Sequence, residues 1–420
     1  MSNQDFIELK EERESLLTKF ESFKARNLAL DMTRGKPCPK QLDLSFPMLN
    51  LVSENNYKAS NGTDCRNYGG LDGIPEVKKL FSEYIEVSED EIVIGGNSSL
   101  NLMHDTIVNA YVYGVSENET PWGKIPKIKF LCPSPGYDRH FAICETLGIE
   151  MIIIDMDENG PDMDQVEKLV LSDDSIKGIW CVPKYSNPTG ITYTNEVVER
   201  LSKMQTKASD FRIFWDNAYN YHHLTDERPE LLNILTTCRE TGNPDRPFIF
   251  GSTSKITFAG AGLSMIGSSK KNIDYIKSKI AFQTIGPDKL NQLRHFKFFE
   301  NIDGLDKHMI KHGEILKPKF DMITKILDKE LGGSGLASWS NPKGGYFISL
   351  DTLEGCATRV IALANEAGVK LTPAGSTYPL KKDPKDCNIR IAPSLPETDE
   401  LELAMEVLTV CIKLASIEVL

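Results

Sequence analysis

Short apolar runs alternate with helical patterns through the middle of this chain, and no other feature limits the fold as strongly. Six consecutive segments are alternately extended and helical: 150–155, 162–171, 177–182, 195–208, 211–215 and 230–241. A short, continuous apolar run is typical of a buried strand, whereas apolar residues three or four positions apart are typical of a helix. The alternation therefore predicts an α/β fold, in which a mostly parallel central sheet has helices on both faces.

A lysine follows one apolar run directly, which is an unusual place for an ammonium group. The run 248–250 ends at Gly251, and the hydroxyl-bearing residues 252–254 lead to Lys255 before a second apolar run at 263–267. Burial removes hydration from an ammonium group and lowers its pKa, which leaves a nucleophilic amine suited to Schiff-base chemistry with a carbonyl. On these residues alone, a solvated loop lysine between two strands is an equal alternative.

Two more strand ends carry polar side chains. The segment 180–190 ends a predicted strand in a Ser-Asn-Pro-Thr-Gly loop that contains Asn187, and the strand 211–215 ends at Asp216, with Tyr219 three residues later. Ligands of open α/β sheets bind at the carboxyl ends of the strands. Together with the lysine, an acid, a phenol and an amide match the polar atoms of pyridoxal phosphate, which are its aldehyde, pyridine nitrogen and ring hydroxyl.

In the motifs Ser-x-Ser-Lys, Asn-Pro-Thr-Gly and Asp-x-Ala-Tyr, the chain resembles the pyridoxal-phosphate aminotransferases of fold type I, the aspartate aminotransferase superfamily. The resemblance runs from about Asp31 to Arg390. Further motifs are similar to those of the bacterial type Ic aspartate aminotransferases: T-R-G-K-P, R-N-Y-G-G-L-D-G, A-G-A-G, I-G-P-D-K-L-N-Q-L-R-H and N-I-R-I-A-P-S. The resemblance implies the fold of type I transferases, with a large cofactor-binding domain and a smaller α+β domain.

The resemblance also implies roles for the residues at matching positions. Lys255 would hold pyridoxal phosphate as a Schiff base and move the substrate proton, Asp216 would keep the pyridine nitrogen protonated, and Tyr219 would bond the ring oxygen together with Asn187. Arg390 would bind the substrate α-carboxylate, beside Asn187 and Gly35. The other expected cofactor contacts are a stacked ring, a strand–turn–helix phosphate site, a strand-end hydroxyl and a tyrosine from a second subunit: Tyr137; Asn97, Ser98 and Ser99; Ser252; and Tyr68.

Ordinary structural roles stay open at several of these positions. Asn97, Ser98 and Ser99 have the residue types of helix N-caps, Tyr137 has an alternative as a core residue, and an arginine on a short strand is usually exposed. His140, three residues after Tyr137, is within reach of the same site if a helix begins there. Family members usually carry an arginine after Gly-Leu, but here Ser264 follows, so we expect serine hydroxyls and a helix terminus to take more of the phosphate contacts.

The two ends of the chain differ in pattern from its middle. An amphipathic helix is predicted at 4–26 from Phe6, Leu9, Leu16, Phe20 and Phe23. The region after residue 302 is predicted as a long helix, a hairpin, a helix, a strand and a final helix: 303–331, 336–340 with 346–350, 356–367, 388–391 and 397–418. We therefore expect residues 51–302 to form the large domain, and residues 1–50 and 303–420 to form the small one.

Composition excludes several classes of function. A formal net charge of -12 over 420 residues, without a basic run, is unsuited to nucleic-acid binding. No apolar run approaches the roughly 20 residues of a membrane span. Nine scattered cysteines without a Cys-x-x-Cys pair indicate reduced thiols, so we expect a cytoplasmic protein. The pairs His222-His223 and His308 with His312 lack further ligands at suitable spacing, so no metal site is predicted.

The resulting hypothesis is an aminotransferase that uses pyridoxal phosphate and forms a homodimer with shared active sites. An excess of arginines in the segments expected at the site favours aspartate or glutamate as donor, with 2-oxoglutarate or oxaloacetate as acceptor: Arg34, Arg66, Arg139 and Arg294, beside Arg390. The alternatives are an aromatic or alanine aminotransferase, a C–S β-lyase and a non-catalytic regulator that binds the cofactor. The last class normally carries a DNA-binding domain, for which this chain has no spare length.

Overall fold

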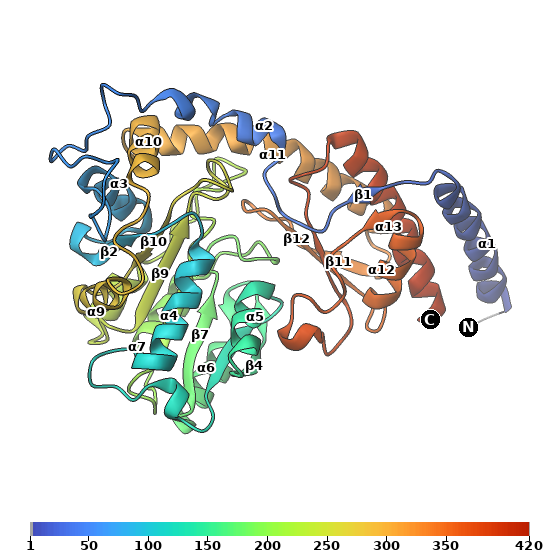
Figure 1. Ribbon diagram of the computed structural model, residues 1–420. Coiled ribbons are helices and arrows are strands. Elements are labelled where there is room, and N and C mark those ends of the chain that lie inside the picture. Colours follow the sequence, from blue (N-terminus) through green and yellow to red (C-terminus); the bar gives the residue numbers. More distant parts are fainter. Residues whose placement is uncertain (1–2, 420) are drawn as a thin grey trace.

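The computed structural model describes residues 3–419, with side chains from residue 11 onward. Figure 1 shows a larger body, built on a seven-stranded sheet, and a smaller body at the other end of the molecule. The long helix α11 (Ile302–Leu331) runs from one body to the other. None of the described helices is long and apolar enough to cross a membrane.

The large sheet confirms the predicted parallel arrangement. Its strands are β2 (Ile92–Ile94), β3 (Lys129–Pro133), β4 (Glu150–Ile154), β7 (Ile176–Cys181), β8 (Arg212–Asp216), β9 (Pro247–Ser252) and β10 (Ser264–Gly267). In space their order is β2-β10-β9-β8-β7-β3-β4, and only β10 is antiparallel to its neighbours. The connection 253–263 between β9 and β10 is too short for a crossover helix, so the chain returns in the opposite direction.

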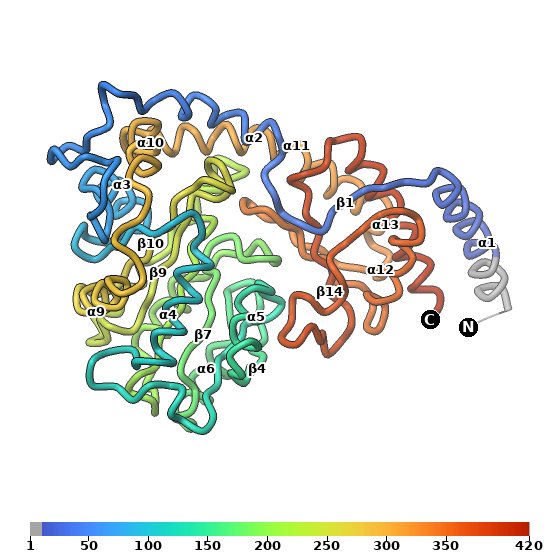
Figure 2. The backbone as a smooth tube through the Cα atoms, in the orientation of Figure 1, coloured from blue at the N-terminus to red at the C-terminus, as the bar shows by residue number. Residues whose placement is uncertain are grey.

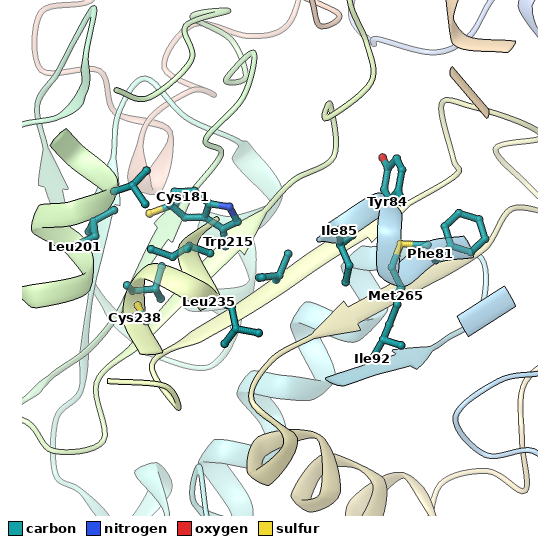
Figure 3. Close-up of a cluster of buried hydrophobic side chains, with 14 of the residues drawn as sticks. Phe81, Tyr84, Ile85, Ile92, Cys181, Leu201, Trp215, Leu235, Cys238 and Met265 are labelled. Atoms are coloured by element: carbon teal, nitrogen blue, oxygen red, sulfur yellow. The ribbon is translucent and has the colours of Figure 1, made fainter. Parts of the chain in front are cut away.

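Helices cover both faces of this sheet. One face packs against α3 (Pro75–Ile85), α6 (Met163–Ser172), α7 (Asn195–Lys203) and α8 (Ile234–Glu240), and the other against α4 (Ser99–Tyr113), α5 (Asp138–Thr146) and α9 (Lys270–Ile280). Figure 3 shows part of the first core, which includes Trp215 and Leu201. Along β8, Ile213 and Trp215 belong to that core and Phe214 to the opposite one, as the alternation of side chains in a strand requires.

Two predicted helix boundaries are wrong, one because of a local cap and the other because of a long-range contact. The helix predicted at 230–241 begins at residue 234, because Asn233 caps it by accepting a hydrogen bond from the Thr236 amide. The helix predicted at 195–208 ends at residue 203, where the buried Arg246 guanidinium donates to the carbonyls of residues 201, 202 and 204. The last carbonyls of a helix need such partners, and this one comes from a distant part of the chain.

The smaller body contains the predicted hairpin. Strands β11 (Ala337–Trp339), β12 (Ile348–Thr352) and β14 (Asn388–Ile391) form an antiparallel sheet, and helices α12 (Ala357–Glu366) and α13 (Thr398–Val419) pack on it. The remaining elements are α2 (Pro39–Asp43), α10 (Lys289–Phe299), β5 (Met156–Asp157), β6 (Gly160–Pro161), η1 (Phe46–Asn50), η2 (Glu89–Glu91), η3 (Trp122–Lys124) and η4 (Pro379–Lys381).

The N-terminal segment joins both bodies. Helix α1 (Asn3–Ala25) buries Phe20 and Phe23 in the core of the smaller body, and β1 (Leu30–Asp31) pairs in parallel with β13 (Val369–Lys370). The segment then passes to α2, which lies beside α11 (Figure 2). Phe6 and Leu9, which were part of the predicted apolar stripe, lie outside the described side chains.

Backbone hydrogen bonds also link the bodies directly. The Leu224 amide donates to the Lys343 carbonyl and the Gly345 amide to the His222 carbonyl, while on another side the Gly136 amide donates to the Thr377 carbonyl. These contacts set the distance between the carboxyl edge of the large sheet and the small sheet, and a cleft lies between them.

Candidate active site

A cleft of about 730 Å³ is lined by both bodies and by the N-terminal segment. The larger body contributes Tyr137, Asn187, Tyr219 and Lys255, the smaller body contributes Phe347, Thr372 and Arg390, and residues 33–36 complete the wall. The cleft thus lies at the carboxyl ends of β7 and β8 and next to the turn after β9, where ligands of such sheets bind.

Lys255 lies in a tight turn that begins as β9 ends. The Thr253 amide bonds the Leu263 carbonyl, and the amides of Ile256 and Thr257 both bond the Thr253 carbonyl. The half-buried lysine places its Nζ 5.0 Å from the centre of the Tyr219 ring. Loss of hydration lowers the pKa of Lys255, although the charge of Asp216 acts in the opposite direction. A deprotonated amine is therefore more accessible here than on an exposed lysine.

Asp216 is a buried carboxylate with only one oxygen satisfied. It is the last residue of β8, the residue is 3% exposed, and its Oδ2 lies 3.0 Å from His140 Nε2. Its Oδ1 is fully buried and has no hydrogen-bond partner among the described residues. A buried polar atom without a partner costs free energy, so this oxygen fits a ligand that brings a donor. A protonated pyridine nitrogen is such a donor, and the residues present therefore fit pyridoxal phosphate.

His140 orients this carboxylate from the first turn of α5. The helix begins at Asp138, with Tyr137 as its N-cap residue, so the condition for His140 to reach the site is met. The imidazole stacks on the Trp180 ring with centroids 4.2 Å apart and planes 6° apart. Trp180 was not a predicted site residue, and nothing in its apolar strand distinguished it from core.

Tyr219 and Asn187 line the cleft as buried polar groups. Burial, together with the negative charge of Asp216, raises the pKa of the Tyr219 phenol, which therefore stays protonated and able to donate. Burial has the same effect on the pKa of Tyr137, whose ring belongs to the cleft lining. Asn187 Oδ1 accepts from Arg390 Nη1 at 3.4 Å. Four of the predicted site residues thus line the same cavity: Tyr137, Asn187, Tyr219 and Arg390.

Arg390 reaches the cleft from β14, where its guanidinium is buried. Nη1 donates to Asp138 Oδ1 at 3.1 Å, and the guanidinium carbon lies 4.9 Å from the Phe347 ring centre. Its Nε is buried and unpartnered within the described structure. Gly35 lies against the same ring, where a Cβ atom would come within 2.5 Å of Phe347 Cζ. Glycine is therefore required for this close approach, and no sequence signal had indicated Phe347 or Asp138.

The expected phosphate residues lie beside the lysine turn. Ser98 is the N-cap residue of α4 without a side-chain capping bond, Asn97 Nδ2 donates to the Gly260 carbonyl, and Ser254 Oγ donates to the Asn97 carbonyl. The start of α4, next to Asn97, is thus linked by hydrogen bonds to residues on both sides of Lys255. Ser264 differs from the expectation, because its hydroxyl is fully buried beneath Gly95.

The predicted arginines separate into two groups. Arg34 and Arg139 line the cleft, and neither forms an ion pair with any residue whose side chain the structure describes. Arg66 instead bonds Asp64 and stacks on a tyrosine ring, and Arg294 bonds Asn291. Only the first two are thus placed to meet a ligand in this cavity.

Tyr68 does not lie in the cleft of its own chain. It is 82% exposed, next to Phe282 at 91% and Ile285 at 62%. The two loops that carry them are held together by Lys289 Nζ, which donates to the Gly69 carbonyl, and by close contact of Gly286 with Gly69. Large apolar side chains exposed together mark an interaction surface.

Two of the remaining histidines of the sequence analysis bond the backbone, and His223 and His312 bond side chains. His308 Nε2 bonds the Ile256 carbonyl and His222 Nε2 bonds the Lys255 carbonyl. Within the described part of the chain, no group of three or more histidine, cysteine, aspartate or glutamate side chains could hold a metal ion.

The chain is similar to known aminotransferases along its whole length. Residues 1–420 match the family model described as aspartate amino-transferase. An aspartate aminotransferase of Corynebacterium glutamicum is 48% identical over 405 residues, which cover 96% of this chain and 94% of that protein. The crystal structure of an aspartate transaminase from the same species has a TM-score of 0.95 at 47% identity and covers 98% and 97% of the two chains.

A more distant structure shares the fold alone. An α-aminoadipate aminotransferase of Thermus thermophilus, complexed with N-(5'-phosphopyridoxyl)-L-leucine, has a TM-score of 0.74 at 17% identity, with 93% of this chain and 94% of that one covered.

Proposed function

Because this chain belongs to the aspartate aminotransferase family, we propose that it transfers the amino group of aspartate or glutamate to 2-oxoglutarate or oxaloacetate, with pyridoxal phosphate bound through Lys255. Its fold is that of the fold-type-I aminotransferases, as predicted, and the chain is an aminotransferase. The observation that carries the proposal is the buried carboxylate of Asp216, which has one oxygen held by His140 and the other free, beside a lysine with a lowered pKa.

The residues in and beside the cleft would hold the cofactor in this proposal. Asp216 Oδ1 would accept a hydrogen bond from the pyridine nitrogen, while His140 keeps the carboxylate in one orientation. Tyr137 would provide a flat ring for stacking. Tyr219 and Asn187 would donate to the ring oxygen. Asn97, Ser98, Ser99 and Ser252 would bind the phosphate, together with the positive end of the α4 dipole. When bound, pyridoxal phosphate supplies an electron-withdrawing ring that lets a proton leave the α-carbon of the amino acid.

Lys255 has two tasks that follow from its surroundings. Its amine would hold the cofactor covalently, and as a free amine it would take the proton from the α-carbon of the amino acid. A base with an ordinary lysine pKa would be protonated and unable to accept this proton. Burial lowers the pKa of Lys255 and so makes the accepting form more populated than on an exposed lysine.

Arg390 binds the α-carboxylate of the substrate. Its Nε is free, and its Nη1 bonds Asp138, a residue that is partly exposed at the cleft. A carboxylate that accepts from Nε and one Nη would make the bidentate pair that a guanidinium favours, and it would compete with Asp138 for the second donor. Asn187, which is already in contact with this guanidinium, orients the same group.

The second carboxylate of a dicarboxylic substrate is assigned to Arg34 and Arg139. Both line the cleft and both lack an ion pair within it. A monocarboxylic amino acid would leave these two cations without a counter-charge close to the bound substrate. We therefore place the distal carboxylate of aspartate or glutamate at Arg34 and Arg139, and the α-carboxylate at Arg390.

A homodimer completes the site. Tyr68, Phe282 and Ile285 form an exposed apolar surface on adjoining loops. In the dimer, Tyr68 would reach the cofactor phosphate of the neighbouring subunit. This contact would take part of the role of the arginine that Ser264 replaces in this sequence.

We also propose that the protein is cytoplasmic. All nine cysteines are free and buried in the structure. Unpaired thiols are typical of a reducing compartment.

Borohydride reduction tests the central assignment. The purified protein with pyridoxal phosphate is reduced, digested and mapped by mass spectrometry. The pyridoxyl group is expected on the peptide that contains Lys255, and a label on any other lysine would contradict the assignment. Single-turnover reactions with individual amino acids then identify the donor, and equal kcat/KM values for alanine and aspartate would disprove the dicarboxylate assignment alone.

A further inference from the structure

Three of the seven histidines of the chain contact one turn of five residues, the Lys255 turn (residues 253–257), and a fourth lies behind them. His222 Nε2 lies 3.3 Å from the Lys255 carbonyl oxygen, and His308 Nε2 lies 2.7 Å from the Ile256 carbonyl oxygen. On the opposite side, His295 Nε2 lies 2.9 Å from the Thr257 hydroxyl. The fourth, His312, lies behind His308. All four are buried.

Two of these imidazoles begin a series of polar contacts that leads away from the turn. His312 Nε2 is 3.1 Å from His308 Nε2, and His312 Nδ1 is 3.0 Å from Gln41 Nε2. The Gln41 amide also donates to the Tyr346 hydroxyl, and its Oε1 accepts from the Cys38 amide at 3.1 Å. Gln41 is fully buried in α2. The chain therefore joins the carbonyl next to Lys255 to the N-terminal segment that carries Arg34 and Gly35.

The hydrogen bonds fix the proton positions along this chain. Because Gln41 Oε1 accepts from a backbone amide, Gln41 Nε2 faces His312 and donates to its Nδ1. The single proton of a neutral His312 is then on Nε2. His308 Nε2 must also carry a proton, since its partner is a carbonyl oxygen. Two protonated Nε2 atoms cannot bond each other, so the 3.1 Å approach of the two rings is a packing contact. Both N–H groups instead face the Ile256 carbonyl, which accepts from His308 at 2.7 Å and also acts on His312.

Both imidazoles stay neutral because burial strongly disfavours their charged forms. Burial lowers the pKa of His308, and it lowers the pKa of His312 to about 3, with the neighbouring His308 adding to the effect. The chain therefore holds the backbone of the lysine turn without placing a further positive charge near the Lys255 amine.

We propose that Gln41, His312 and His308 are positioning residues that couple the substrate-facing segment 33–38 to the backbone of Lys255. The lysine side chain has four rotatable bonds, so the location of its amine depends on a stationary backbone. Misplacement of a reacting group by about 1 Å can cost about a hundredfold in rate. The inference rests on the proposed role of Lys255, and none of the three positioning residues lines the substrate cleft.

The test compares variants that break the chain at increasing distance from the lysine. Gln41→Met removes the amide at similar volume, His312→Leu removes the middle link, and His308→Leu removes the last one. His308→Gln restores an N–H donor at the last link. His223→Leu is the matched control, because His223 neighbours His222 but bonds the Tyr185 hydroxyl instead of the lysine turn.

Two measurements report the position of Lys255 independently of turnover. The first is the pH midpoint of the visible absorbance of the Schiff base between Lys255 and pyridoxal phosphate. Gln41→Met is expected to shift it by about half a pH unit or more, although residue 41 contacts neither the cofactor nor the substrate in the proposed arrangement. The second is hydrogen–deuterium exchange of the amides 256 and 257 in the cofactor-free protein, which is expected to accelerate. His308→Gln should restore both values, and His223→Leu should change neither.

Coupling is measured by the double variant Gln41→Met with His308→Leu. If the residues act as one chain, the double variant shifts the midpoint no further than His308→Leu alone, whereas independent residues give additive shifts. We expect kcat to fall about tenfold in Gln41→Met, with little change in cofactor affinity.

Three outcomes overturn the inference. The first is additive midpoint shifts in the double variant, and the second is an unchanged midpoint in Gln41→Met. The third is that His312→Leu and His308→Leu lower the thermal stability only as much as His223→Leu and leave the absorbance spectrum unchanged. A pyridoxyl label on a lysine other than Lys255 would instead refute the proposed function.

Discussion

The floor and the rim of the cleft are built in opposite ways. On the floor, Asp216 and Lys255 are held by other residues of the same chain: His140 bonds the carboxylate, and imidazoles surround the lysine turn. At the rim, Arg34 and Arg139 are exposed and unpaired within the described side chains, and Tyr68 lies outside the cleft altogether. The chain alone therefore preorganises the chemistry, whereas it leaves the selection of the substrate to groups that a ligand or a second subunit must complete.

The difference follows from what each half must do. A reacting group that is already in place needs no reorganisation during the reaction, and fixed dipoles act strongly in a buried site. A group that selects a carboxylate must be reached by that carboxylate from water, and a buried, permanently unpaired cation would cost free energy. Substitutions on the floor are therefore expected to reduce turnover of all substrates, and substitutions at the rim to change preference.

Asp216→Asn should produce the largest effect. An amide cannot balance the positive charge of a protonated pyridine nitrogen, so we expect kcat to fall by about a hundredfold to a thousandfold for every amino acid. Cofactor binding should persist, because His140 and the phosphate contacts are unchanged. Stopped-flow half-reactions with aspartate and alanine measure the loss. Near-normal turnover would show that the floor does not depend on this carboxylate.

Arg390→Lys tests the boundary between floor and rim. A lysine keeps the charge but loses the planar pair of donors, so kcat/KM should fall about tenfold to a hundredfold for aspartate and alanine alike. Steady-state kinetics with both amino acids measure the change. If only aspartate were affected, Arg390 would bind the distal carboxylate, and the proposed orientation of the substrate would be reversed.

Arg34→Leu and Arg139→Leu test the rim itself. Each should lower kcat/KM for aspartate by about tenfold, or about 1.4 kcal/mol, and leave alanine nearly unchanged. Arg66→Leu is the matched control, since Arg66 already bonds Asp64 away from the cleft. Equal losses for alanine and aspartate would show that these arginines support the fold and do not select the substrate.

Mixed dimers test whether the rim is shared between subunits. Lys255→Ala and Tyr68→Phe variants, each of low activity, should regain up to about a quarter of wild-type sites when mixed and refolded, because one site in each heterodimer carries neither substitution. A mixture of Lys255→Ala with Arg390→Lys should not regain activity if Arg390 acts in the same active site as Lys255 of its own chain. Light scattering gives the oligomeric state, and a monomer would refute the shared site.

Most residues of the floor could be predicted from the sequence, but few of the residues that hold them in place could be. Asn187, Asp216 and Lys255 could be found because each follows an apolar strand, and parallel strands bring such ends to one edge. His308 and Gln41 could not, because their meeting requires α2 and α11 to pack side by side, and no local pattern encodes that contact. The start of the helix predicted from residue 230 is wrong for a different, local reason, since its apolar residues 231 and 232 match a helical pattern but precede the cap at Asn233.

The stability of the protein in acid tests whether the histidines behind the Lys255 turn are neutral, and here we expect the smallest effect. Burial lowers the pKa of His312 from 6.5 to about 3 in the folded protein. Below pH 6.5 the unfolded chain therefore binds a proton that the folded chain does not, so this residue destabilises the fold progressively as the pH falls from about 6.5 towards 3. The slope approaches about 1.4 kcal/mol per pH unit for one proton.

Carboxylates also titrate over part of this range, so the informative quantity is the difference between wild type and His312→Gln. Glutamine carries no titrating group, and we expect the Tm of the wild type to fall by about two degrees more than that of the variant between about pH 6.5 and 5. Differential scanning calorimetry at matched ionic strength measures both. Parallel curves would mean that His312 takes up a proton in the folded state, and the floor would then carry a second positive charge near Lys255 instead of a neutral network.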